Sequence, residues 1–174
     1  MAKLRPARCY KKLERPFTRK SRFRKKAFVS NAPNPKIRIF HMGNKTKEFP
    51  YRVSLYVKEG VQIRHNALEA ARIVSNRFLN NNLGKSYHFH IKIYPHHILR
   101  ENPIAKGAGA DRFQTGMKHA FGKTIGLAAR VKPGQEIMYV DVEENGIEKA
   151  KMALHRAGKK LPCKYSLEIR KVGS

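Results

Sequence analysis

The chain has 174 residues and a large excess of positive charge, with 38 Lys and Arg against 12 Asp and Glu, a net charge of +26 and a pI near 10.5. This length suits one domain with a substantial core. Its longest apolar runs are far shorter than the ~18 residues of a membrane span, and no apolar segment follows the basic N-terminus as in a signal peptide. We expect a polyanionic partner, and nucleic acid is favoured over a membrane surface because no basic amphipathic helix is visible.

The positive charge is concentrated at the N-terminus. Residues 1 to 30 carry 12 basic residues and one acidic residue, whereas half of the acidic residues lie in 133 to 174. The basic N-terminal arm and the loop that follows Leu99 are therefore expected to face phosphate, and the C-terminal part to face solvent or protein.

Residues 1–35 are predicted to form an extended basic arm. Single aromatics (Tyr10, Phe17, Phe23, Phe28) alternate with basic residues and prolines, and no apolar period is visible. Alone, such a segment is expected to be disordered, because it cannot bury enough apolar surface to offset its ordering entropy. On RNA, its cations would neutralise phosphates, while the aromatics would stack on bases or anchor the arm to the domain. A solubilising tail is the alternative.

Residues 36–174 are predicted to form a single α+β domain. Period-two alternation predicts strands in 35–40, 51–57, 87–99, 124–131, 136–142 and 165–169. Helical spacing predicts two helices, at about 66–83 and 147–157. Their inner stripes are predicted to be Ala67, Ala70, Ala71, Val74 and Phe78 in the first helix, and Ile147, Ala150, Leu154 and Ala157 in the second. The order of elements indicates a two-layer domain with two helices packed on one mixed or antiparallel sheet.

Both predicted helices begin with a possible capping box. Asn66 is followed by Glu69, and Asn145 by Glu148, which is the spacing at which a side-chain cap and a reciprocal carboxylate can satisfy the first N–H groups.

The stretch from Leu99 to Lys123 combines four glycines, Pro103 and four alanines with four basic residues after Arg100. This composition predicts a long, basic, mobile loop at about 100–117, and such loops are usually functional. A tolerated insertion is the alternative. Two phosphate-binding motifs fail here: Arg112 replaces the third glycine of a dinucleotide fingerprint, and Met117 stands where a P-loop needs its first glycine before Gly122, Lys123 and Thr124.

Catalytic and metal sites are not favoured by the sequence. Glu101, Asp111 and His119 are the only catalytic candidates, and neighbouring cations would keep the carboxylates ionised rather than tuned for proton transfer. The four histidines at 88, 90, 96 and 97 have no cysteine or acidic residue nearby to complete a zinc site, so an RNA-facing or solvated strand surface is the better interpretation. Cys9 and Cys163 lie far apart, which suits a reducing compartment. We therefore expect no enzyme activity, no cofactor, no metal and no small-molecule substrate.

Several segments together resemble one ribosomal protein family. They are RPARCY at 5–10, PKIRIF at 35–40, ALEAARI at 67–73, YPHHILREN at 94–102, GAGADRFQTGMKHAFGK at 107–123 and ARVKPGQ at 129–135. In this order they resemble the archaeal and eukaryotic "L-ten-e" branch of a universal large-subunit family whose bacterial branch is "L-sixteen". The chain stops at Ser174 without the longer tail of the eukaryotic members, which favours an archaeal source.

The resemblance implies an α/β-hammerhead-like domain in the cytoplasmic ribosome, bound to large-subunit rRNA and neighbouring ribosomal proteins. It implies an rRNA-binding set formed by Arg5, Arg8, Lys11, Lys12, Arg15, Arg19, Lys20, Arg22, Arg24, Lys25, Lys26, Arg112, Lys118 and Lys123. It also implies a loop that faces the tRNA acceptor arm near the peptidyl transferase centre, formed by Asn102, Pro103, Ile104, Ala105, Lys106, Gly107, Ala108, Gly109, Ala110 and Asp111. The alternative functions are a non-integral RNA chaperone and an RNA-modifying factor.

Overall fold

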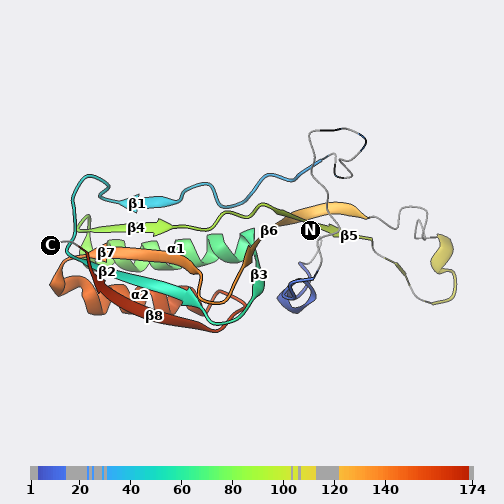
Figure 1. Cartoon of the computed structure of the whole chain (residues 1–174). Coiled ribbons are helices and arrows are strands. Elements are labelled where there is room, and N and C mark those ends of the chain that lie inside the picture. Colours follow the sequence, from blue (N-terminus) through green and yellow to red (C-terminus); the bar gives the residue numbers. More distant parts are fainter. Residues whose placement is uncertain are drawn as a thin grey trace.

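The computed structural model describes residues 4–14, 23, 25, 29, 31–102, 104–105, 107–112 and 122–172 (Figure 1). The strands are β1 (His41–Gly43), β2 (Tyr51–Val57), β3 (Val61–Arg64), β4 (Tyr87–Ile91), β5 (His97–Glu101), β6 (Lys123–Val131), β7 (Glu136–Val142) and β8 (Tyr165–Lys171). The α-helices are α1 (His65–Leu83) and α2 (Ile147–Gly158), and short 3-10 turns include η1 (Ala7–Cys9), η3 (Ala110–Arg112) and η5 (Glu144–Gly146). No helix in the described part of the chain is long and apolar enough to cross a bilayer.

A five-stranded sheet forms the body of the molecule, in the order β1-β4-β7-β2-β8. Helices α1 and α2 lie side by side on one of its faces (Figure 1). Alternate strand residues such as Val53, Phe89 and Val140 are fully buried beneath them, together with Leu154 of α2. The residues between them in sequence, such as Arg52, His88 and Tyr139, form the polar opposite face.

A second sheet of three strands, in the order β3-β6-β5, lies at one end of the body. Strands β5 and β6 continue away from the helical layer (Figure 1). A small separate core, made of Val29, Ile98 and Leu127, fastens the chain preceding β1 to this sheet.

The predicted α+β class and the two helices packed on a sheet are confirmed, but the prediction of a single sheet is wrong. There are two sheets, and every strand pair among the described residues is antiparallel. Strand β3 was not predicted, because its four residues lie between a turn and a helix and are too few to show a period. The segment 87–99 is not one strand, because residues 92–96 separate β4 from β5.

The predicted strand at 35–40 is also wrong. Ile37 is fully buried while Ile39 is 53% exposed, so the two isoleucines do not share a face, and strand pairing begins only at His41. Pro33 and Pro35 lack the N–H groups that an earlier start of the ladder would need.

The helix boundaries are close to those predicted, but details of both helices differ. The buried stripe of α1 is Leu68, Ala71, Ser75 and Leu79, so most of the predicted positions lie beside it and are only partly buried. Neither helix has a side-chain cap: the N-cap residues are Arg64 and Gly146, and Glu69 pairs with Arg72 instead of reaching back.

Candidate nucleic-acid interface

Residues 4–14 lie along β3 and are held to the three-stranded sheet mainly through their backbone carbonyls. The carbonyl oxygens of Lys11 and Lys12 accept hydrogen bonds from the backbone N–H (2.9 Å) and side-chain Nε2 (2.7 Å) of Gln62. Arg64 Nη1 donates to the carbonyl of Arg5 at 2.9 Å, and Arg130 Nη2 donates to that of Glu14 at 2.8 Å. The expectation that the whole arm is disordered without RNA is therefore wrong for this part, because these bonds and the packing offset part of its ordering entropy.

Glu101, at the end of β5, adds a side-chain anchor for the arm. Its carboxylate pairs with Arg5 Nε at 2.6 Å and accepts a hydrogen bond from the Tyr10 hydroxyl at 3.3 Å. Burial, followed by the nearby Glu101 charge, raises the pKa of Tyr10. Tyr10 thus serves as an anchor to the domain, one of the two roles proposed for the arm aromatics, and Glu101 is committed to structure rather than catalysis.

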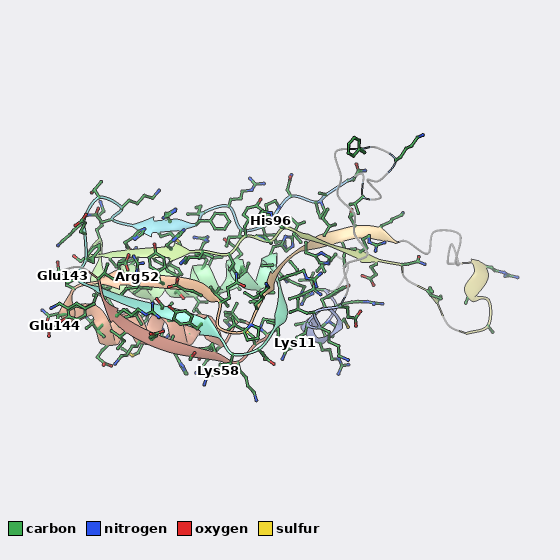
Figure 2. All side chains as sticks on the ribbon, viewed as in Figure 1. Lys11, Arg52, Lys58, His96, Glu143 and Glu144 are labelled. Atoms are coloured by element: carbon green, nitrogen blue, oxygen red, sulfur yellow. The ribbon has the colours of Figure 1, made fainter. Side chains whose placement is uncertain are left out.

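Several cations lie beside this docked arm, among them Arg64 and Arg130. Burial and then the charges of Arg130 and Arg100 lower the pKa of His97, while burial and then Lys36 and Arg64 lower that of His65. By contrast, Glu143 and Glu144 lie at the opposite end of the body from the arm residue Lys11 (Figure 2). These two acidic residues therefore lie away from the docked arm.

The predicted rRNA-binding residues within the described segments divide into paired and exposed side chains. Arg5 pairs with Glu101, and Lys11 Nζ lies 3.1 Å from a carboxylate oxygen of Glu59. The exposed cations are Arg8, Lys12, Lys25, Arg112 and Lys123. Ion pairs on the protein do not prevent phosphate contacts, but they show that Arg5 and Lys11 also position the arm.

Part of the predicted tRNA-facing loop is described. Ile104 is 52% exposed, and Gly107, Ala108 and Gly109 lead into the short turn η3, which contains the Asp111 backbone. Gly107 and Gly109 have φ of +126° and +74°, values that favour glycine, with open space where a Cβ would lie. Asn102 and Ala105 make contacts within the chain.

Gly122 and Lys123 lead into strand β6, not into a helix, so the backbone required by a P-loop is not present there. Nine predicted site residues lie outside the described part of the chain: Arg15, Arg19, Lys20, Arg22, Arg24, Lys26, Pro103, Lys106 and Lys118.

Three residues that hold the arm were not predicted from the sequence, namely Gln62, Arg64 and Arg130. Their partners are mostly backbone carbonyls of the arm, and an arginine that binds a carbonyl has the same sequence signature as one that binds phosphate. Only the strand register, in which Gln62 lies opposite Arg130, brings two of them together.

The histidines of β4 form part of a polar cluster on the outer sheet face. The ring of His41 stacks on that of His90 at 3.9 Å, and His88 Nδ1 lies 3.2 Å from Asp141. Among the described residues, no group of three or more His, Cys, Asp or Glu side chains is arranged to hold a metal ion.

Comparison with known proteins identifies the family of this chain. A family model described as ribosomal protein L16p/L10e matches residues 17–168. The large ribosomal subunit protein uL16 of Archaeoglobus fulgidus is 48% identical over 95% of this chain and 92% of its own length. The uL16 proteins of Methanocella arvoryzae (48% identical, 95% of this chain and 94% of its own) and Staphylothermus marinus (49%, 91% and 89%) are similar to the same extent. These relatives are proteins of the large ribosomal subunit, and this chain belongs to the ribosomal protein L16p/L10e family.

Proposed function

We propose that the chain is a structural constituent of the large subunit of the cytoplasmic ribosome and binds rRNA through its N-terminal arm and the adjacent three-stranded sheet. The observation that carries this proposal is the docked arm, whose backbone is held by Gln62, Arg64 and Arg130 while Arg8 and Lys12 remain exposed. Because part of the arm is already ordered in the free protein, it should lose less conformational entropy when it binds phosphates.

The loop between β5 and β6 is proposed to face the acceptor arm of tRNA. It extends from the end of the molecule that carries the basic arm, and it includes the exposed Arg112 and glycines with open space around them. Such a backbone can adapt to successive tRNAs, while the paired strands β5 and β6 fix its root.

Sedimentation of cell lysate through sucrose gradients at low and high salt tests the proposal. A free protein with six to ten phosphate contacts would lose roughly a thousandfold or more in affinity between about 50 and 200 mM salt. We expect the chain to remain with large subunits through the high-salt wash, as an integral ribosomal protein does. Release to the top of the gradient would instead indicate a factor that visits the ribosome.

The loop assignment needs a separate test on ribosomes reconstituted with variant protein. We expect Arg112→Ala or Lys106→Ala to slow tRNA accommodation without changing the urea midpoint of the free protein. Lys58→Ala is the matched control, because Lys58 is an exposed lysine on the body of the molecule (Figure 2). Unfolding of the free loop variants, or an equal effect of Lys58→Ala, would contradict this role.

A further inference from the structure

Strand β8 forms one margin of the five-stranded sheet and pairs with β2 alone (Figure 1). The two strands keep one continuous antiparallel register, from Tyr165 opposite Val57 to Lys171 opposite Tyr51. Strand β8, which is described along its whole length, contains no proline and no bulge against β2. A regular sheet edge of this kind presents backbone groups that a further extended chain can bind.

The hydrogen bonds at the two ends of β8 fix which of its backbone groups point outward. The N–H of Val172 donates to the carbonyl of Pro50 at 2.7 Å, and the N–H of Lys58 donates to the carbonyl of Lys164 at 3.0 Å. In an antiparallel pair, residues that bond to the neighbouring strand alternate with residues whose N–H and C=O point the other way. Residues 166, 168 and 170 therefore bond to β2, as 164 and 172 do.

The outward groups of β8 are those of the alternate residues, namely Tyr165, Leu167, Ile169 and Lys171. Among the described residues, no hydrogen-bond partner lies against the N–H or the C=O of any of these four. The edge thus offers a donor and an acceptor at every second residue, about 7 Å apart.

The other sheet edges in the described part of the chain are shorter or occupied. The edge of β3 is covered by the arm, because the N–H of Gln62 donates to the carbonyl of Lys11. Strand β1 has only three residues, and β5 has five, of which His97 and Arg100 make contacts within the chain. Strand β8 is therefore the edge at which a partner strand could pair over the greatest length.

The side chains of β8 also favour a polypeptide partner. Leu167 and Ile169 lie opposite Leu55 and Val53, so they share the sheet face that the helices cover. Leu167 packs against the core, but Ile169, nearer the end of the strand, is 42% exposed. An added strand would place an apolar side chain beside Ile169 on the same face and remove it from water.

The charges at this edge indicate what kind of chain fits it. The exposed side chains of Lys164, Arg170 and Lys171 outnumber the single acidic residue, Glu168. A second copy of this chain would bring another net charge of +26 to the same place. An RNA backbone presents phosphate acceptors at every unit, which does not match an edge where carbonyls also need donors. An extended protein segment with acidic residues matches both the hydrogen bonds and the charge.

We propose that β8 is a docking edge for an extended segment of a neighbouring protein of the large subunit, which adds a strand to the sheet. The backbone of this segment exchanges hydrogen bonds with Leu167 and Ile169. One of its apolar side chains covers Ile169, and an acidic one lies near Arg170. The proposal rests on the ribosomal function proposed above and goes beyond it, because this protein interface is separate from the RNA-binding arm.

Hydrogen exchange resolved to single amides tests the edge by comparing the free chain with purified large subunits. In the free chain we expect the amides of Leu167 and Ile169 to exchange fast and the amide of Glu168, which bonds to β2, to exchange slowly. In the subunit, the two fast amides should slow by about tenfold or more, because each acquires a carbonyl partner. Unchanged exchange at both would overturn the proposal, and slowing in a concentrated solution of the free chain would overturn it in favour of a second copy.

A photo-cross-linking residue identifies what lies beside the edge. Subunits are assembled with a chain that carries p-benzoylphenylalanine in place of Glu168, irradiated, and analysed by mass spectrometry. We expect a cross-link to one segment of another large-subunit protein. A cross-link to rRNA or to a second copy of this chain would overturn the proposal.

Two proline variants use the alternation along β8. Ile169→Pro removes an N–H that points outward, whereas Glu168→Pro removes one that bonds to β2, so the second should lower the urea midpoint of the free chain more. In subunits, Ile169→Pro should reduce the yield of the cross-link by about fivefold or more, the effect of one hydrogen bond, while Ile169→Val should retain it. Equal yields from these two variants would overturn the proposal. The exchange measurement needs no variant, so it decides the question even if a proline variant does not fold.

The docking edge and the proposed function can fail separately. A chain that remains with large subunits through the high-salt wash but keeps fast exchange at Leu167 and Ile169 would refute the docking edge alone. Slow exchange at these amides in low-salt subunits, with release of the chain at high salt, would support the edge and refute the integral ribosomal role.

Discussion

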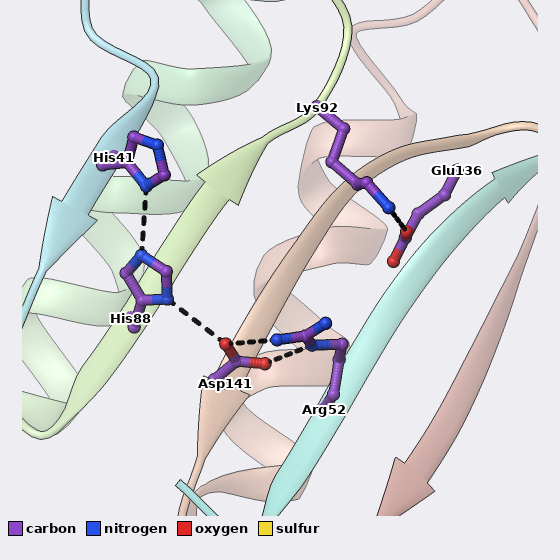
Figure 3. Close-up of polar contacts among 6 residues, drawn as sticks. All are labelled: His41, Arg52, His88, Lys92, Glu136 and Asp141. Atoms are coloured by element: carbon purple, nitrogen blue, oxygen red, sulfur yellow. Dashed lines mark hydrogen bonds and ion pairs between the residues drawn. The ribbon is translucent and has the colours of Figure 1, made fainter. Parts of the chain in front are cut away.

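The buried carboxylate of Asp141 makes the outer sheet face a place where one substitution should cost much of the domain's stability. Asp141 is 7% exposed, and Arg52 holds it with two hydrogen bonds, Nε to Oδ1 at 2.6 Å and Nη2 to Oδ2 at 3.0 Å (Figure 3). The same guanidinium lies 3.8 Å from the centre of the Tyr139 ring. The perturbation that we choose is Arg52→Met, which keeps much of the apolar contact with Tyr139 but removes the positive charge.

The expected loss follows from the exposure of the two partners. Breaking a fully buried ion pair leaves an uncompensated charge and costs about 3–5 kcal/mol. The Arg52 side chain is 31% exposed, so solvent would screen part of that charge. We therefore expect a loss of about 2–3 kcal/mol, which lowers the urea midpoint by about 1–1.5 M if the m-value is ~2 kcal/mol/M.

Arg170→Met is the matched control, because Arg170 lies opposite Arg52 across the β2–β8 pair and its own ion pair with Glu168 is exposed on both sides. Urea unfolding followed by circular dichroism at pH 7.5 should show a large shift for Arg52→Met and little change for the control. Arg52→Met combined with Asp141→Asn should recover part of the loss, since no uncompensated carboxylate remains. Equal midpoints for the two single variants would refute the reasoning.

Three further predictions concern histidine titration, helix packing and thiol reactivity. Burial, and then the charges of His41 and His88, lower the pKa of His90 from 6.5 to about 4. The unfolded chain therefore takes up a proton at this position before the folded chain does, so the stability from neutral His90 is complete above pH 6.5 and is lost as pH falls towards 4. Between pH 7 and pH 4.5 the unfolding free energy should drop by about 2 kcal/mol less in His90→Gln than in the unchanged chain. Urea unfolding at a series of pH values measures this drop, and an equal drop in both proteins would contradict the prediction. Gly158→Ala should destabilise the domain by about 1–3 kcal/mol because a Cβ there would overlap the Tyr165 ring. A thermal melt should show the loss, and adding Tyr165→Leu should restore part of it. Burial raises the pKa of Cys163 to about 11, whereas Cys9 is exposed. Iodoacetamide at pH 8 should therefore label Cys9 first by mass spectrometry, and faster labelling of Cys163 would mean that the C-terminal segment opens in solution.

The sequence was informative where burial follows a regular period. The alternation of Val53, Leu55 and Val57 predicted β2, and that of Phe89 and Ile91 predicted β4, because each strand has one face in the core. It was less informative for α1, where alanines suggested a close-packed stripe but Leu68 and Leu79 occupy the core. Small residues tolerate either position, so they do not fix the rotation of a helix about its axis.

The second sheet and the docked arm could not be predicted, for two physical reasons. Strands β3, β5 and β6 are brought together by long-range pairing, and β3 is too short to show a pattern. The arm is held mainly by its backbone carbonyls, which every residue possesses, so its sequence contains no signal for docking.

Net charge alone therefore gives an incomplete account of how such a protein meets RNA. Arg64 and Arg130 contribute to the charge of +26, yet both donate hydrogen bonds to carbonyls of the arm and so position the exposed cations beside it. Replacing either of them would remove one charge and also free part of the arm, whereas replacing the exposed Arg8 would remove one charge only. Both changes should reduce the slope of log K against log salt by about the amount expected for one phosphate contact. Only replacement of Arg64 or Arg130 should also add an entropic cost to RNA binding, at every salt concentration. The affinity extrapolated to high salt, where attraction to phosphate is screened, should therefore fall when Arg64 or Arg130 is replaced. It should not fall when Arg8 is replaced.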